Sequence, residues 1–254
     1  MKWILDIHDM KNKKNNGILL IWTIIILIFV VAFIYIEINK TKTEAVFNQE
    51  QEQIYRRKLQ KPSLANLVID TSAEHMQGNP DTAQVIVIEY SDTECRYCKT
   101  FYYKFQEQIL KIYQSEVALV YRHFPLPIYP KSKKEAEALE CAADQGGNKM
   151  FWKYLDELYQ ATPSDNGLDP LELPRIAQKG NLDIIRFNRC LDENNYTEKV
   201  AEQRLVGEDL GIRQTPSVII WDKTSDKKQL INGANSRFLE IKTIIEGILQ
   251  TPSK

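Results

Sequence analysis

The chain has 254 residues with a formal net charge of −1, and 43% of its residues are hydrophobic. That length allows one large domain with appendages. The near-neutral balance gives no sign of a basic surface, so we expect no nucleic-acid partner. Its four cysteines and three histidines exclude a disulfide-dense mini-protein and a histidine-rich metal site.

An apolar run near the N-terminus predicts a membrane anchor. Residues 18–36 read ILLIWTIIILIFVVAFIYI, and as a helix they would span ~28 Å, close to the hydrocarbon thickness of a bilayer. Lys11, Lys13 and Lys14 precede the run. We therefore expect residues 1–17 in the bacterial cytoplasm and the rest of the chain outside the inner membrane, in the periplasm or its equivalent. A cleaved signal peptide is the alternative, but residues 33–37 offer no small-x-small cleavage site.

Residues 37–78 predict a polar stalk and an irregular lead-in to a domain over residues 79–250. The turn Gly78-Asn-Pro-Asp81 comes first. The continuous apolar run Val85–Tyr90 is typical of a central buried strand. A helix is expected from the cysteine pair that follows to near Ser115, and a second strand over Glu116–Tyr121.

The middle of the chain predicts a helical block. Its helices are expected over 133–143, 150–160, 171–178, 182–191 and 196–210. Strands return at 217–221 and 229–231, and the last helix carries Phe238, Ile241 and Ile245 on one face. The expected order is therefore β-α-β, a helical insertion over about 127–210, and then β-β-α.

The segment Cys95-Arg-Tyr-Cys98 is a CxxC motif between an expected buried strand and an expected helix. Two thiols so spaced at a helix start can form and open a disulfide, and the helix N-terminus favours a thiolate on Cys95. Zinc ribbons also use CxxC motifs. A zinc site would require Cys141 and Cys190 to join this pair, whereas structural zinc sites usually draw on two tight pairs. We therefore expect no metal.

Six short segments follow one another in a characteristic order. They are 88–98 (IEYSDTECRYC), 121–125 (YRHFP), 139–142 (LECA), 151–152 (FW), the helix that holds Cys190, and 211–216 (GIRQTP). Together they resemble the DsbA-like thiol–disulfide oxidoreductases over residues 78–249. The resemblance implies an α/β thioredoxin-like fold with an inserted α-helical domain, here preceded by a single transmembrane helix. Arg96 departs from the proline that many members carry, which leaves the direction of electron flow open.

The resemblance and the local chemistry together suggest roles for three residues. Cys95 is the expected nucleophile, and Cys98 is the expected resolving thiol that attacks the mixed disulfide. Glu89 lies within the apolar strand, where a carboxylate is costly to bury without a purpose. It resembles the buried acid of the family, which relays a proton for the second cysteine. The alternative is a strand-end glutamate that reaches solvent.

Two further pairs complete the expected site and its support. The resemblance implies that the Thr215-Pro216 bond is cis and faces the CxxC motif, with the Thr215 backbone pairing with a substrate strand. The sequence alone favours a trans bond. Cys141 and Cys190 lie on apolar faces of expected helices, so outside the cytosol we expect a structural disulfide. A second redox pair and two buried free thiols are the alternatives, and His123 is interpreted as a structural histidine.

These features predict a membrane-anchored enzyme that introduces disulfides into cysteine-containing exported proteins, with no metal or organic cofactor. The family implies that a membrane quinone-linked partner re-oxidises it. Two alternatives stay open. The same site could run in reverse as a disulfide reductase or isomerase, or the chain could be a non-catalytic membrane-anchored binding module.

Overall fold

The computed structural model describes residue 27 and residues 30–37, 39–40, 42 and 63–250. Most of the expected anchor over 18–36 and most of the expected stalk lie outside these residues. Residues 30–37 are helical. Within the described part of the chain, no helix is both long and apolar enough to cross a membrane. The chain divides into the units Met1–Lys61 and Pro62–Lys254, and the second holds the sheet and its helices.

The described part of the second unit contains a five-stranded sheet with the strand order β1-β3-β2-β4-β5. The strands are β1 (His75–Gln77), β2 (Val85–Ser91), β3 (Val117–His123), β4 (Ser217–Asp222) and β5 (Lys227–Ile231). β2 and β3 run parallel, and the other neighbouring pairs are antiparallel. All residues of the central strands β2 and β3 are buried. The expectation of a central buried strand before the cysteine pair is thus confirmed.

Strand β1 was not expected, because residues 63–82 carry no clear alternating pattern. It has three residues and pairs with β3, so that Met76 lies opposite Val120. Such a short edge strand is stabilised by a partner distant in sequence, and local sequence gives little signal of it. The sheet therefore starts before residue 79, at which we expected the domain to begin.

Each face of the sheet has its own apolar cluster, because side chains along a strand alternate between faces. Val85 and Val87 pack with the helices α2 (Arg96–Phe105), α4 (Ser132–Ala161) and α8 (Phe238–Leu249). Ile86 and Ile88 pack on the opposite face with Phe124 and other side chains that include Leu67, Leu210 and Ile212. Each such buried side chain contributes on the order of 1.5–3 kcal/mol, so both layers hold β2 in place.

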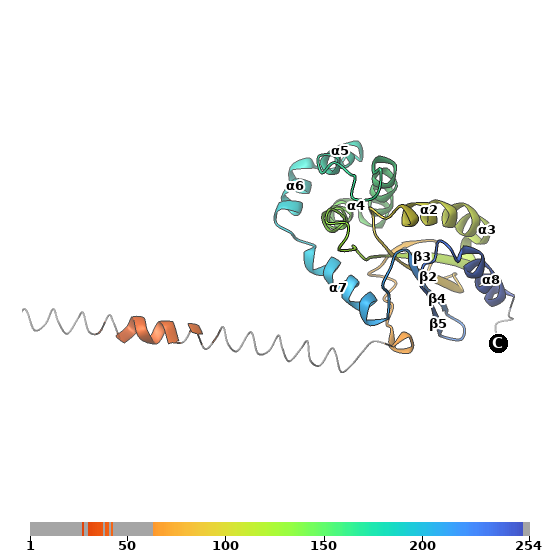
Figure 1. Ribbon diagram of the computed structural model, residues 1–254, viewed down its shortest axis with the longest axis horizontal. Coiled ribbons are helices and arrows are strands. Elements are labelled where there is room, and N and C mark those ends of the chain that lie inside the picture. The colour runs from red at the N-terminus through yellow and green to blue at the C-terminus, as the bar shows by residue number, and fades with distance from the viewer. Residues whose placement is uncertain (1–26, 28–29, 38, 41, 43–62, 251–254) are drawn as a thin grey trace, which may run out of the picture. The chain divides into compact units, whose positions relative to one another are not determined.

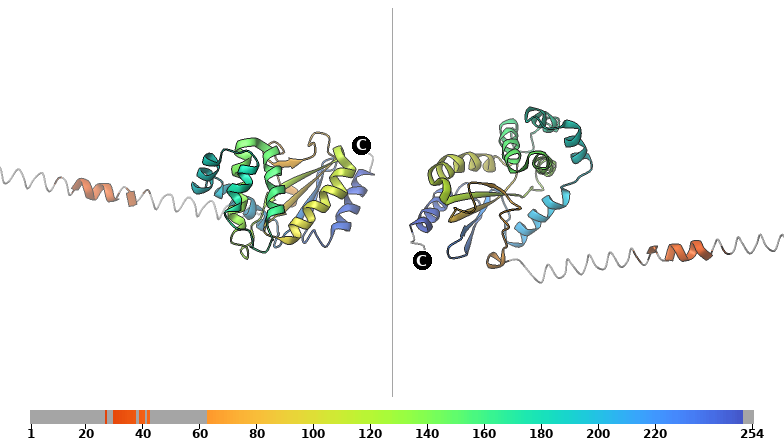
Figure 2. Two further views of the ribbon diagram at one scale, coloured as in Figure 1. Left: turned by 90° about the horizontal axis from the view of Figure 1, so that it is seen from above. Right: turned by 180° about the vertical axis from the view of Figure 1, so that it is seen from behind.

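The remaining elements follow the expected order, and Figure 1 shows the helices from the middle of the chain grouped together, apart from α8. The helical segments are η1 (Leu64–Asn66), α2 (Arg96–Phe105), the π turn η2 (Gln106–Leu110), α3 (Lys111–Tyr113), η3 (Gln114–Glu116), α4 (Ser132–Ala161), α5 (Glu172–Lys179), α6 (Ile184–Asp192), α7 (Thr197–Asp209) and α8 (Phe238–Leu249). The views of Figure 2 show the same grouping from two other sides. This is the expected thioredoxin-like arrangement with a helical insertion.

The two helices expected over 133–143 and 150–160 are joined end to end as α4. Gly147 lies between them with φ 63° and ψ −160°, which is a non-helical conformation. A positive φ of this size is readily adopted by glycine and disfavoured for residues with a Cβ. The chain therefore changes direction at Gly147, and both halves of α4 contribute side chains to the apolar cluster that contains Val85 and Val87.

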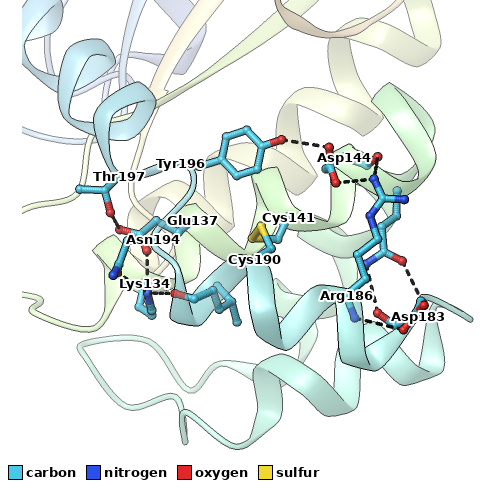
Figure 3. The surroundings of a disulfide bond; sticks show 12 residues. Lys134, Glu137, Cys141, Asp144, Asp183, Arg186, Cys190, Asn194, Tyr196 and Thr197 are labelled. Atoms are coloured by element: carbon cyan, nitrogen blue, oxygen red, sulfur yellow. Dashed lines mark hydrogen bonds and ion pairs between the residues drawn. A yellow bond between two sulfur atoms is a disulfide. The ribbon is translucent and has the colours of Figure 1, made fainter.

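A disulfide joins Cys141 of α4 to Cys190 of α6, with a Cα–Cα distance of 5.9 Å. Both residues are buried. Figure 3 shows polar contacts beside the bond, where Arg186 and the Tyr196 hydroxyl donate hydrogen bonds to the Asp144 carboxylate. The disulfide and these contacts hold α6 and the start of α7 against α4.

Replacing both Cys141 and Cys190 by alanine is expected to lower the free energy of unfolding of the full-length protein by about 3–4 kcal/mol. The reason is that the bond closes a loop with a sequence separation of 49, which restricts the unfolded chain. Guanidinium denaturation measures the change. The variant Cys95→Ala/Cys98→Ala keeps this bond and is the matched control. A loss no larger than that of the control would contradict a structural role.

Candidate active site

The boundary between β2 and α2 places the two thiols. β2 ends at Ser91, and α2 starts at Arg96, so that Cys95 is the N-cap residue. The Cys95 N–H donates to the Asp92 carbonyl at 3.1 Å, and the Cys95 carbonyl accepts from the Cys98 N–H at 3.0 Å. These bonds fix the turn before the helix and bring the Cys95 sulfur to the helix N-terminus.

The two sulfurs are free thiols in unlike environments. Cys95 is 3% exposed and Cys98 is fully buried at 0%. The Cys98 side chain hydrogen-bonds the Cys95 sulfur, and this contact, with help from the backbone N–H groups of Tyr97 and Cys98, lowers the pKa of Cys95 to about 6. Those N–H groups belong to the first helical turn, where the positive end of the helix dipole favours a negative charge.

Burial has the opposite effect on the second thiol. It raises the pKa of Cys98 well above its usual value, and the hydrogen bond to Cys95 and the charges of Cys95 and Glu89 act in the same direction. The pair therefore holds one ready thiolate and one thiol that keeps its proton. This difference is what stepwise thiol–disulfide exchange needs.

The loop before β4 forms the wall opposite Cys95. The Thr215-Pro216 peptide bond is cis. The Thr215 carbonyl lies 3.5 Å from the Cys95 sulfur and accepts a hydrogen bond from it. The Pro216 carbonyl accepts from the Ala234 N–H at 2.7 Å, which ties this loop to the segment after β5. The fold thus brings together residues that are 120 positions apart in the chain.

Glu89 is fully buried below the cysteine pair. Desolvation raises the pKa of its carboxyl to about 8, although a hydrogen bond from Ser91 acts in the other direction. Its Oε1 accepts from the Ser91 hydroxyl at 2.8 Å. The solvent-reaching alternative for this residue is not what the structure shows. At neutral pH a carboxyl with such a pKa is mostly protonated and is available as an acid.

Three further buried carboxyls surround the cysteine turn, and the sequence analysis did not identify them. Asp92 accepts hydrogen bonds from the N–H groups of Glu94 and Leu126, and burial raises its pKa to about 7. Burial likewise raises the pKa of Glu135 to about 9, and its Oε2 accepts from the Thr93 hydroxyl. Asp92 and Glu94 lie within three residues of Cys95 in the sequence. Their closeness to Cys95 in the sequence was the one signal that could have marked them as part of the site.

The carboxylate of Glu94 holds the loop between α4 and α5. It accepts hydrogen bonds from the Thr162 hydroxyl and from the N–H groups of Gly167 and Leu168. The Glu94 carbonyl also accepts from the N–H of Asp165 at 2.8 Å. The residue thus joins the cysteine turn to the helical insertion.

Arg96 and His123 each have a carboxylate partner away from the sulfurs. Arg96 forms an ion pair with Asp165 at the surface, and its Nε lies 3.2 Å from a carboxylate oxygen of that residue. The Nε2 of His123 lies 3.0 Å from Glu140, which also binds His75. Burial lowers the pKa of His123. These contacts give His123 the structural role expected from its position at a strand end.

The structure also bears on the zinc alternative. Cys141 and Cys190 are bonded to one another within the insertion. They therefore do not join the CxxC pair, which lies at the start of α2. Among the residues that the structure describes, no group of three or more His, Cys, Asp or Glu side chains could hold a metal ion.

Comparison with known proteins places the chain in a family with a thioredoxin-like fold. A family model described as thioredoxin matches residues 70–238. The chain belongs to this family. The crystal structure of DsbA2 from Pseudomonas aeruginosa superposes with a TM-score of 0.59 at 24% identity, covering 70% of this chain and 95% of that one. For oxidised BdbD from Bacillus subtilis the TM-score is 0.58 at 21% identity, with 72% and 96% covered. The fold is that of the DsbA-like thioredoxin-fold oxidoreductases.

The curated relatives include much longer proteins. The Na(+)/H(+) antiporter NhaA 3 of Salinispora tropica is 31% identical over 153 residues, which are 60% of this chain and 22% of that protein. The NhaA 1 antiporter of Salinispora arenicola is 32% identical over 154 residues. The chain spans about a fifth of the length of the curated relatives it matches.

The pKa of Cys95 in this DsbA-like site can be measured directly. Absorbance of the reduced protein at 240 nm is expected to fall as pH falls through about 6, because the Cys95 thiolate takes up a proton. Cys98→Ala is expected to move this midpoint upward, since the largest cause of the low pKa is the hydrogen bond from Cys98.

The variant Cys95→Ser and the oxidised protein are the controls, and neither should show this transition. A midpoint at the ordinary thiol value of about 8.5 in the unmodified protein would contradict the assigned environment of Cys95.

Proposed function

We propose that this protein introduces disulfides into cysteine-containing exported proteins by exchange at Cys95–Cys98. One observation carries the proposal. The hydrogen bond from Cys98 lowers the pKa of the Cys95 thiol at the helix start to about 6, whereas burial raises the pKa of the Cys98 thiol. A low nucleophile pKa stabilises the dithiol form of the enzyme, which makes its disulfide a stronger oxidant.

The reaction follows from this asymmetry. A substrate thiolate attacks the Cys95 sulfur of the oxidised enzyme, the Cys95–Cys98 bond breaks, and Cys98 leaves with the electron pair and takes up a proton. A second substrate thiolate then attacks the substrate sulfur of the mixed disulfide. Cys95 leaves as a thiolate, so the substrate gains a disulfide and the enzyme ends as a dithiol. Two electrons pass from substrate to enzyme.

The loop at Thr215-Pro216 supports an extended substrate. Its backbone carbonyl already lies beside the Cys95 sulfur. A peptide that places its cysteine at Cys95 can pair with the Thr215 backbone in the manner of an added strand. Main-chain pairing of this kind accepts many sequences, which suits an enzyme that acts on many exported chains.

The opposite direction of electron flow is the main alternative. A reductase or isomerase could use the same thiols, and Arg96 in place of the family's usual proline leaves this direction open. A binding module with idle cysteines is the alternative from another class. The reduction potential and the fate of mixed disulfides separate the three.

We expect the Cys95–Cys98 couple, equilibrated against glutathione buffers, to have a potential near about −120 mV, the range of a disulfide donor. A value near about −270 mV would instead mark a reductant. Cys98→Ala is first loaded with glutathione as a mixed disulfide at Cys95. It is then expected to pass this bond to an unfolded model protein with one reduced cysteine, with glutathione leaving, and to accumulate the protein–protein mixed disulfide because the resolving thiol is missing. Cys95→Ala should accumulate none. Absence of any reversible couple would leave the binding module as the function.

The membrane anchor over 18–36 is part of the proposal, since it would hold the enzyme near newly exported chains and near a membrane quinone-linked partner that re-oxidises it. We expect the full-length chain to resist carbonate extraction from bacterial membranes. In spheroplasts, added protease should digest Pro62–Lys254 while a tag before residue 1 stays protected. Loss of the tag from the mature chain would instead indicate a cleaved signal peptide.

A further inference from the structure

The Ser91 hydroxyl contacts the buried Glu89 carboxyl at the end of the strand that precedes the cysteine turn. Ser91 is 1% exposed and ends β2, two residues after Glu89. Residues two apart on a strand face the same side. Ser91 and Glu89 therefore both face the side of the sheet that α2 and α4 cover, which is where Cys98 is buried.

Two hydrogen bonds position this hydroxyl. Its oxygen is 2.8 Å from Oε1 of Glu89 and 3.1 Å from the hydroxyl of Tyr159. Tyr159 belongs to the second half of α4 and is fully buried. A residue of the helical insertion thus reaches the floor of the cysteine site.

Glu89 and Ser91 act on the Cys98 thiol in different ways. The charge of Glu89 raises the pKa of the Cys98 thiol, whereas a hydrogen bond from the Ser91 hydroxyl lowers that pKa because it favours the thiolate. A serine hydroxyl has one proton to donate and two lone pairs that accept. The single proton points either to Glu89 or to the Cys98 thiolate, and the two lone pairs can accept from the Tyr159 hydroxyl and, when the proton points to the sulfur, from the protonated Glu89 carboxyl. The hydrogen-bonding capacity of Ser91 is then filled.

We propose that the Ser91 hydroxyl carries the proton between Glu89 and the Cys98 sulfur, with Tyr159 as the residue that positions it. When Cys98 leaves as a thiolate, the Ser91 proton moves to the sulfur and the Glu89 proton moves to the Ser91 oxygen. Glu89 ends as a carboxylate, and the serine is unchanged. In the reverse direction both protons move back. This inference rests on the proposed exchange at Cys95–Cys98.

Several other titratable groups face Glu89 and must be separated from it in a pH profile. They are Cys95, Cys98 and Tyr102 of α2, Tyr121 of β3, and Tyr159 of α4. Burial raises the pKa of all three tyrosines, so they stay neutral in the range of interest. Asp92 titrates at about 7 and lies close enough to Cys95 for their charges to interact. The variant Asp92→Asn therefore shows which inflexion belongs to Asp92.

The test is the rate at which a dithiol peptide reduces the Cys95–Cys98 disulfide of the full-length protein, measured by quenched flow between pH 5.5 and 9.5. The rate is divided by the thiolate fraction of the peptide. In the wild type this corrected rate should fall as Glu89 loses its proton near pH 8. Ser91→Ala should lower the corrected rate below pH 8 about tenfold, less than the full effect of a general acid. It should also remove the inflexion.

Matched variants separate a proton carrier from a packing residue. Ser91→Thr keeps a hydroxyl and should keep the inflexion, while thermal unfolding shows whether each variant is folded. The double variant Ser91→Ala/Glu89→Gln should be no slower than Glu89→Gln alone, since the two residues act in one path. Tyr159→Phe should slow the reaction less than Ser91→Ala does.

The proposal is overturned if Ser91→Ala keeps the wild-type inflexion, if its loss multiplies with that of Glu89→Gln, or if Ser91→Thr is as slow as Ser91→Ala. These outcomes are distinct from failure of the proposed function. That failure would be a wild-type protein with no Cys95-dependent exchange, or one whose potential is that of a reductant. In the second case the relay is still tested in the same assay, because the proton crosses the same hydroxyl in either direction.

Discussion

Two neighbouring sulfurs are held in opposite electrostatic environments, and the chemistry of the site depends on that contrast. Cys95 caps α2, where the thiol of Cys98 and backbone N–H groups of the first helical turn favour its thiolate. One helical turn later, Cys98 lies under the sheet and the insertion, where a charge is costly. A shift of one pKa unit corresponds to about 1.4 kcal/mol. Because the pKa of Cys95 is lowered and that of Cys98 is raised, Cys95 is the sulfur that is ionised first and reacts first.

The helical insertion completes this environment as well as covering it. The second half of α4 supplies Tyr159, and its first half supplies Glu135 beneath the turn before Cys95. The loop after α4 is held by Glu94, so the turn and the insertion share hydrogen bonds. The disulfide between α4 and α6 lies in the same block and joins these two helices covalently.

Much of the architecture could be read from patterns along the chain. The apolar run Val85–Tyr90 was long enough and uniform enough to predict a central strand, and the stripe from Phe238 to Ile245 predicted the last helix. The sequence did not predict β1, because its three residues are too few to show a periodicity and their partner lies in β3. The sequence also did not predict that two helices are joined at Gly147, since a glycine in that position can either end a helix or bend it.

The sequence by itself determined the chemistry that is available: two thiols at CxxC spacing, an acid in an apolar strand, and a proline before β4. Spacing and hydropathy suffice for these because they act over a few residues. The tertiary structure alone decided the contact of Ser91 with Tyr159, the contact of Cys95 with Thr215, and which carboxyls are buried. Those contacts join residues up to 120 positions apart. Packing and desolvation, which set the pKa of a group, arise only when the chain has brought such residues together.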